Sequence, residues 1–206
     1  MPISLFYHPY SRAAGTIWAL EEAGVSYDLR IVDIMKGEQK GSDLLSRNPM
    51  GKLPTLVDND MVVTEAAAIA LYLADRYAPG RLAPALDDPK RGTYLRWAFF
   101  APSVIEPAVM AKSSEWTVKE VAAGWGNYAS MMTAVESALA GKSFVLGDAF
   151  SMVDVVLGGT LIFMMGFKQI EPTPTLQAYV ARLNARPAWQ RAEARNAAMR
   201  QELGLK

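Results

Sequence analysis

Two short segments of the chain offer groups that could hold a peptide ligand. Pro54 interrupts an apolar run, and a proline inside a strand removes a ladder donor, so it belongs at an edge or a special turn. If the Leu53–Pro54 bond is cis, the chain turns sharply and the Leu53 backbone faces outward, where an extended peptide can pair with it. Glu65 and Ala66 open a helix whose N–H groups can hold a carboxylate.

The residues around these segments predict a hairpin followed by a helix. Residues 55–63 read TLV-DND-MVV, which is two β-rich runs joined by turn residues. Ala66, Ile69, Leu73 and Tyr77 then recur at helical spacing and mark a buried face. One short stretch therefore combines an unpaired strand edge with a helix N-terminus.

The preceding residues predict a strand-helix-strand unit. Residues 3–7 are β-rich, Ser11 is placed as a helix N-cap, and Gly24 is a natural helix stop. Residues 25–34 alternate as a second strand, and residues 35–47 predict a loop with one short helix. This order implies a parallel strand pair with a right-handed crossover.

The rest of the chain predicts only helices after a proline-rich linker at residues 79–88. Pro102 and Pro107 must kink or break the helix that contains them. Thr117–Glu120 has the pattern of a capping box and predicts the start of a long helix that ends at Gly141.

A second capping pattern, with Asp154 three residues after Ser151, opens the most apolar helix of the chain. Thr173-Pro174 and Arg186-Pro187 are each expected to begin a further helix. The sequence therefore predicts an α/β domain followed by an all-helical domain.

Composition excludes several classes of function. The 206 residues are 51% hydrophobic, and 21 basic residues balance 21 acidic ones, so nucleic acid is not an expected partner. No apolar run is long enough to span a membrane, and the N-terminus does not resemble a signal peptide, so a cytoplasmic location is expected. Without cysteine and with one histidine, no metal site is expected, and chemistry by a protein thiol is excluded.

The stretch NPMGKLPTLVDNDMVVTEAAAIALYLADRY resembles the glutathione-binding segment of the cytosolic glutathione S-transferase family. Its signatures are the Leu-Pro-Thr-Leu strand at residues 53–56 and the Glu65-Ala66 pair that opens the next helix. FSMVDVVLG and RPAWQRA are similar to later helices of the family. The likeness extends over the whole chain and is to bacterial members of the theta- or beta-like serine type.

The resemblance implies a thioredoxin-like N-terminal domain over residues 1–78, the linker at 79–88 and an all-α helical domain over 89–206. It implies a homodimer that uses glutathione as a substrate, a role in detoxification, and thiol activation as the main chemical task. A free thiol has a pKa of about 8.5, so the protein must stabilise the thiolate.

Two hydroxyls compete for that role. Ser11 matches the position of the activating serine in theta-like members, and Tyr7 matches that of the activating tyrosine in alpha- and mu-like members. We expect Ser11 to act, with an ordinary N-cap as its alternative; the alternative for Tyr7 is a half-buried strand residue. Arg12 either points to solvent or balances an anion such as the thiolate. Beta-like members carry their cysteine near this position, and its absence argues against disulfide exchange.

The resemblance also assigns the residues that bind glutathione. The Leu53 backbone beside Pro54 is expected to pair with the cysteinyl part, and Glu65 to accept from the γ-glutamyl ammonium. Family members commonly have serine at position 66. Ala66 offers only its N–H, which removes one hydrogen bond of roughly 0.5–1.5 kcal/mol. Lys52 is a candidate for the glycyl carboxylate or a solvated turn residue.

An apolar electrophile is expected to contact a few of the aromatic and methionine residues. The candidates are Tyr10, Trp97, Phe100 and Met110, most of which could equally be core. His8 is expected at the surface or at the rim of the site rather than as a general base.

Two other classes of function stay open. The same thiolate could support a peroxidase, an isomerase or a dehalogenase. Alternatively, the chain could be a binding or interaction module that kept the fold and lost turnover, which the alanine at position 66 favours mildly.

Overall fold

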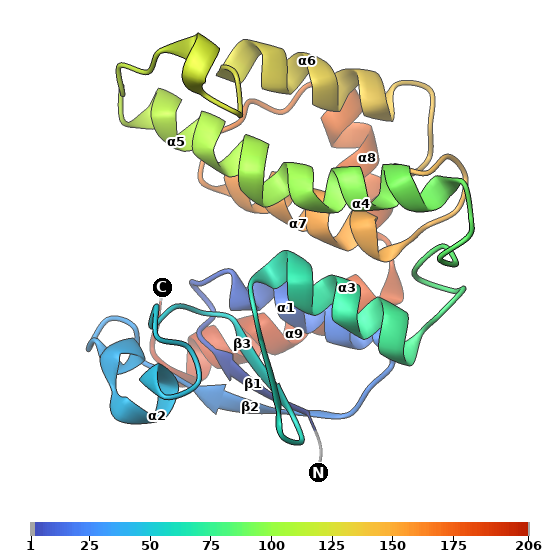
Figure 1. Ribbon diagram of the computed structural model, residues 1–206. Helices are drawn as coiled ribbons and strands as arrows, with labels where there is room; N and C mark the ends of the chain where they lie inside the picture. The colour runs from blue at the N-terminus through green and yellow to red at the C-terminus, as the bar shows by residue number, and fades with distance from the viewer. Residues whose placement is uncertain (1–2, 206) are drawn as a thin grey trace. The chain divides into compact units, whose positions relative to one another are not determined.

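The computed structural model describes residues 3–205, and their contacts divide the chain into two compact units (Figure 1). The first unit combines residues 1–78 with residues 186–206, and the second spans residues 79–185. The first boundary lies where the sequence predicts the linker. Residues 186–206 differ from the sequence-based division, which grouped them with the helical domain.

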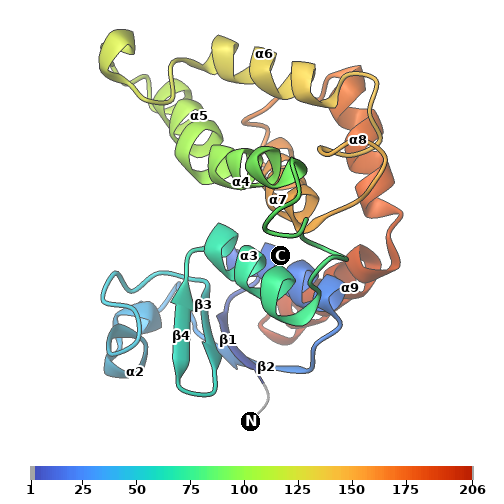
Figure 2. The ribbon, with the colours of Figure 1, turned by 45° about the vertical axis from the view of Figure 1, so that its right-hand side comes forward.

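The first unit is built on a four-stranded sheet in the order β2-β1-β3-β4 (Figure 2). The strands are β1 (Ile3–Tyr7), β2 (Tyr27–Ile31), β3 (Thr55–Asp58) and β4 (Met61–Thr64). β1 and β2 are parallel, whereas β3 runs antiparallel to both β1 and β4. The predicted parallel pair and the predicted hairpin are therefore both present.

Helices cover both faces of this sheet. α1 (Ala13–Ala23) and α3 (Ala66–Tyr77) pack against each other, and α1 also contacts β1. α1 ends at Gly24, whose φ of 72° is left-handed and whose N–H donates to the Leu20 carbonyl at 3.0 Å. This confirms Gly24 as the helix stop, since glycine adopts the conformation without a Cβ penalty.

The opposite face of the sheet carries the 3₁₀ turn η1 (Glu38–Lys40) and the short helix α2 (Ser42–Leu45). Leu44 of α2 packs with Phe6 and Val32 in a buried cluster on this face. Because side chains alternate along a strand, the neighbours of Phe6 on β1 point to the α1 side. The result is the predicted thioredoxin-like arrangement.

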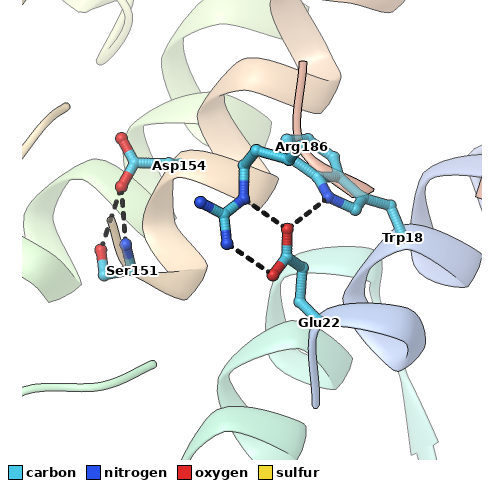
Figure 3. Close-up of polar contacts among 5 residues, drawn as sticks. All are labelled: Trp18, Glu22, Ser151, Asp154 and Arg186. Atoms are coloured by element: carbon cyan, nitrogen blue, oxygen red, sulfur yellow. Dashed lines mark hydrogen bonds and ion pairs between the residues drawn. The ribbon is translucent and has the colours of Figure 1, made fainter. Parts of the chain in front are cut away.

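The last helix, α9 (Pro187–Glu202), belongs to the first unit because it packs along α1. The buried Glu22 carboxylate accepts two hydrogen bonds from Arg186, at 2.6 and 2.8 Å, and one from Trp18 Nε1 at 2.9 Å (Figure 3). Trp18 also packs edge-on against Trp189 at a ring separation of 5.0 Å. These long-range contacts explain why residues 186–206 belong to the first unit and not to the helical unit.

The second unit begins with α4 (Lys90–Phe100), which continues through a π-helical turn, η2 (Ala101–Ile105), into α5 (Glu106–Ser113). Pro102 lies in the π turn and Pro107 at the start of α5. Proline cannot donate to the regular helix ladder and clashes with the carbonyl four residues before it. The wider turn accommodates this, and it is the predicted interruption.

The helix predicted to start at residues 117–120 begins later. Glu120–Ala122 forms only a 3₁₀ turn, η3, and α6 runs from Tyr128 to Leu139. Its capping box uses Asn127 instead: the Asn127 side chain accepts from the Ser130 N–H at 2.8 Å, and Ser130 Oγ accepts from the Asn127 N–H at 3.2 Å. Glycines at 124 and 126 separate the two boxes, and Gly126 has a φ of 65°, so the earlier start was wrong.

The predicted box at Ser151 is confirmed. α7 (Met152–Gly166) starts there, and the fully buried Asp154 accepts from the Ser151 N–H at 2.9 Å (Figure 3). Asp154 also accepts from the Val145 N–H at 2.9 Å. Tyr179 of α8 (Pro174–Asn184) also donates to Asp154, at 2.9 Å. This carboxylate ties α7 to α8 and to the loop before it.

No helix within residues 3–205 is both long enough and apolar enough to cross a membrane.

Candidate active site

Three strand ends bring the predicted glutathione-binding residues of the first unit together. β1 pairs antiparallel with β3 so that Phe6 lies opposite Thr55, and Thr55 lies opposite Thr64 at the end of β4. The loop to Ser11, the Leu53–Pro54 turn and the Glu65–Ala66 helix start therefore all project from the same end of the sheet.

Ser11 lies in the loop between β1 and α1, where its hydroxyl has two partners. Oγ donates to the His8 carbonyl at 2.8 Å and accepts from the Ala13 N–H at 3.2 Å. The side chain is half-buried. The hydroxyl thus takes part in the helix start, although the position before the first helical residue is Arg12.

His8 is buried rather than at the surface or rim, with 1% of its surface exposed. Its Nδ1 accepts from the Tyr10 N–H at 3.1 Å, and its carbonyl accepts from the Ser11 N–H at 3.0 Å. Burial lowers the pKa of His8, and the carboxylate of Asp33 opposes this change. An accepting Nδ1 requires the neutral ring with its proton on Nε2.

Tyr7 is fully buried and its phenol points to α9. Its hydroxyl donates to Asn196 Oδ1 at 2.6 Å, and Asn196 Nδ2 donates to the Ala14 carbonyl at 3.3 Å. Burial raises the pKa of Tyr7 far above its usual value. This phenol contacts the last helix rather than an open site, and no local sequence signal connects residues 189 positions apart.

The Leu53–Pro54 bond is cis. Within residues 3–205, the backbone N–H and C=O of Leu53 have no hydrogen-bond partner. The adjacent Lys52 carbonyl accepts from Asn48 Nδ2 at 3.0 Å and from Thr55 Oγ1 at 3.2 Å. The buried Asn48, which the sequence analysis did not single out, therefore holds the turn that presents the Leu53 backbone.

Glu65 precedes α3 with a φ of 67° and a ψ of 120°. Such a backbone is rare outside glycine, and residues held in it cluster at functional sites. The Glu65 side chain is exposed, and Ala66, the first residue of α3, is half-buried. In the described chain the N-cap side chain makes no hydrogen bond to this helix start, so it leaves the first N–H groups of α3 available to a ligand.

Lysine side chains lie on or beside the turn that precedes Leu53, and an arginine lies at the start of α1. Lys52 is exposed, and Lys40 Nζ donates to the Met50 carbonyl at 2.9 Å. Gly51, with a φ of 57°, lies between them, and a Cβ there would come within 2.7 Å of the Gln39 carbonyl. Lys40 was not among the predicted residues, because no sequence pattern connects it with Lys52. Arg12 is exposed at the start of α1.

The residues proposed for an electrophile are split between the units. Tyr10 belongs to the first unit and is 38% exposed. In the second unit, Met110 is 43% exposed and Phe100 is half-buried. Trp97 is buried, and its ring packs against that of Phe100 with the ring centroids 4.7 Å apart. Trp97 is thus a core residue of α4, as its alternative interpretation held.

Comparisons with known proteins agree with this geometry. The family model of the glutathione S-transferase N-terminal domain matches residues 1–75, and that of the C-terminal domain matches residues 119–182. Glutathione S-transferase Z2 of Arabidopsis thaliana is 32% identical over 84% of this chain and 82% of its own length. The chain belongs to the glutathione S-transferase family. Glutathione S-transferase Z1 of the same plant is 34% identical, with 84% and 83% covered.

Solved glutathione S-transferase structures share the fold. The theta class enzyme from Xanthomonas axonopodis pv. citri, solved with glutathione bound, is 31% identical and has a TM-score of 0.72 over 93% of this chain and 97% of its own. This glutathione S-transferase is therefore an enzyme with the thioredoxin-like and helical domains of its family. Within residues 3–205 there is no group of three or more side chains of the kinds that ligate metals.

Proposed function

We propose that this glutathione S-transferase activates glutathione with Ser11 and transfers it to a small, largely apolar electrophile. The observation that supports the proposal is the convergence of Ser11, the unpaired Leu53 backbone and the strained Glu65 at one end of the sheet. A tripeptide thiol with an extended backbone and free carboxylates is the ligand that such a set of groups complements.

The Ser11 hydroxyl can turn from its present acceptor to a thiolate at low cost. The His8 carbonyl keeps the hydrogen bond from the Ser11 N–H when Oγ rotates away. The Ala13 N–H donates to the same Oγ, which makes the hydroxyl a stronger donor. Each unit by which the glutathione pKa falls corresponds to about 1.4 kcal/mol of preference for the thiolate.

Tyr7 is the weaker candidate. Its hydroxyl is engaged with Asn196 in a buried environment that raises the pKa of the phenol. Donation to a thiolate would leave the buried Asn196 Oδ1 without its donor, at a cost of about 1–3 kcal/mol. We therefore assign Tyr7 to the docking of α9.

For the rest of glutathione we propose the family's division of roles. The Leu53 backbone pairs with the cysteinyl unit, Glu65 accepts from the γ-glutamyl ammonium, and the Ala66 N–H binds the γ-glutamyl carboxylate. Lys52 faces the glycyl carboxylate, with Lys40 on the same turn as a further cation. Arg12 balances negative charge near the thiolate.

The electrophile contacts exposed apolar side chains of α4 and α5. Phe99 and Met110 are 60% and 43% exposed, which suits contact with an apolar molecule better than the buried Trp97. We also propose a homodimer. Met61 and Val62 are exposed apolar residues of β4, the strand at one edge of the sheet, and exposed apolar side chains of this kind are what a second copy would cover.

A thiolate titration tests the assignment. Ultraviolet absorbance of glutathione bound to the protein is followed against pH for the wild type, Ser11→Ala and Tyr7→Phe. We expect a thiol pKa well below the free value in the wild type and in Tyr7→Phe, and a return towards the free value in Ser11→Ala.

The other outcomes are distinct. If Tyr7→Phe alone restores the free pKa, glutathione activation stands and the serine assignment is wrong. If glutathione binds to the wild type without any shift of its pKa, the protein is a glutathione-binding module, and the transferase proposal fails.

A further inference from the structure

The only histidine of the chain makes two kinds of contact with the loop that carries Ser11. Its carbonyl accepts from both the N–H and the hydroxyl of Ser11, at 3.0 and 2.8 Å. Its ring accepts from the Tyr10 N–H at 3.1 Å through Nδ1 and packs edge-on against the Tyr10 ring at 6.0 Å. Only 1% of His8 is exposed, so water does not compete for these contacts.

The ring contact adds a second restraint to the turn that the His8 carbonyl and the Ser11 N–H already close. Pro9 has no N–H, so the chain between β1 and Ser11 has one fewer backbone donor. A side-chain acceptor at position 8 that bonds to the N–H two residues later does what an Asx turn does with a shorter side chain. The imidazole thus restrains the conformation of residues 8–11 together with the backbone bond and, with it, the direction of the Ser11 Cα–Cβ bond.

We propose that His8 is a positioning residue: its neutral ring holds the turn that presents the Ser11 hydroxyl to the glutathione sulfur. The inference rests on the proposed role of Ser11. His8 is not a general base here, because Nδ1 is occupied by the Tyr10 N–H and the ring is buried.

Two substitutions at position 8 separate positioning from filling of space. His8→Leu keeps an apolar side chain of moderate size but has no acceptor for the Tyr10 N–H. His8→Asn is smaller, yet its Oδ1 can accept from the N–H two residues on. If the acceptor is what matters, the smaller Asn variant is the better enzyme, which is the opposite of what packing alone predicts.

The readouts are the thiol pKa of bound glutathione and the catalytic constants. In His8→Leu we expect the thiol pKa to move most of the way to its value in Ser11→Ala. At a pH below the thiol pKa, the thiolate fraction falls about tenfold for each unit of that rise, and kcat/KM should fall by up to this factor because the more basic thiolate is also the better nucleophile. Glutathione affinity measured at low pH, where the bound thiol is protonated, should change less than twofold. His8→Asn should keep a thiol pKa close to that of the wild type.

Val32→Ala is the matched control for lost stability. Val32 is buried in the cluster with Phe6 and Leu44, and its truncation destabilises the same unit while the His8 ring and its acceptor stay in place. It should leave the thiol pKa unchanged. If His8→Leu does not fold, the comparison of His8→Asn with His8→Ala replaces it, since alanine also lacks the acceptor.

The outcomes distinguish the two proposals. If Ser11→Ala leaves the thiol pKa unchanged, the role of Ser11 is wrong and the present inference falls with it. If Ser11→Ala raises the thiol pKa but His8→Leu does not, Ser11 acts without His8 and only the present inference is overturned. Equal thiol pKa values in His8→Leu and His8→Asn would also overturn it.

Discussion

Ala66 lacks a side-chain hydroxyl that could donate a hydrogen bond to glutathione. It is the first residue of α3 and is half-buried, and its N–H is the group that we assign to the γ-glutamyl carboxylate. Ala66→Ser adds a hydroxyl there, so we expect glutathione to bind more tightly by about 0.5–1.5 kcal/mol, or roughly two- to tenfold. Isothermal titration measures the change.

Ala68→Ser is the matched control for this substitution. Ala68 is an exposed alanine in the same helical turn, so it has the same change in helix propensity without a proposed ligand contact. An equal gain in affinity from both variants would show that the hydroxyl acts on the helix and not on glutathione.

Glu65 combines a proposed ligand contact with a strained backbone. Its φ of 67° costs a non-glycine residue on the order of 1–3 kcal/mol. Glu65→Ala and Glu65→Gly both remove the carboxylate, but only glycine relieves the strain. We expect equal losses of glutathione affinity in the two variants and a higher unfolding free energy for the glycine variant, measured by urea titration. A glycine variant no more stable than the alanine variant would contradict this expectation.

At the scale of the element, α9 is held to the first unit by a buried ion pair. Removing one partner of such a pair leaves a buried charge, and Arg186→Met should lower the unfolding free energy by about 3 kcal/mol. The Glu22 carboxylate would lose both hydrogen bonds from Arg186 and keep the one from Trp18 Nε1. Urea unfolding monitored by tryptophan fluorescence includes a signal from this region, because two of the five tryptophans, Trp18 and Trp189, lie in contact here.

Arg191→Met provides the comparison for that measurement. Arg191 lies on the same helix and donates to Glu21 at 2.7 Å, but the arginine side chain is 57% exposed. Exposed ion pairs contribute little, so we expect a loss of well under about 1 kcal/mol. Equal losses in the two variants would mean that the burial of Glu22 is not what matters.

Elements with strong local signals were predictable from sequence, and those set by distant contacts were not. Gly24 and the Ser151–Asp154 box each specify a helix end through a contact within a few residues, and both were found. The residues at 117–120 have an equally good local pattern, yet the chain uses Asn127, because glycines intervene and only a 3₁₀ turn forms first.

The same reasoning applies to the site. Leu53, Pro54, Glu65 and Ala66 adjoin strand ends whose pairing follows from the hairpin pattern, so their convergence was predictable. The burial of His8 and the contact between Tyr7 and Asn196 depend on the packing of α9 and of neighbouring loops. Residue periodicity contains no information about those contacts.

At the scale of the whole molecule, stability should depend on pH through one histidine. Burial lowers the His8 pKa below its ordinary 6.5, so the unfolded chain takes up a proton that the folded chain does not. The contribution of His8 is complete above pH 6.5 and is lost as the pH falls through the folded pKa, with a slope of at most about 1.4 kcal/mol per unit. Urea unfolding at pH 5.5 and 7.5 measures it.

His8→Asn isolates this dependence, because it removes the only imidazole of the chain. Burial raises the pKa of Asp154, so this residue acts with the opposite sign: above pH 3.8 the folded chain binds its proton more readily than the unfolded chain. Asp154 is present in both proteins and cancels in the difference. Identical pH dependence in the wild type and His8→Asn would refute the assignment.

The first unit is assembled from two separated parts of the chain, residues 1–78 and 186–206. During synthesis at about 5–20 residues per second, residues 79–185 take roughly 5–20 s to appear. For that time the Tyr7 phenol and the Glu22 carboxylate lack Asn196 and Arg186, their buried partners. A nascent chain halted before residue 186 should therefore be cleaved readily by protease within its first 78 residues, and residues 186–206 should confer protection.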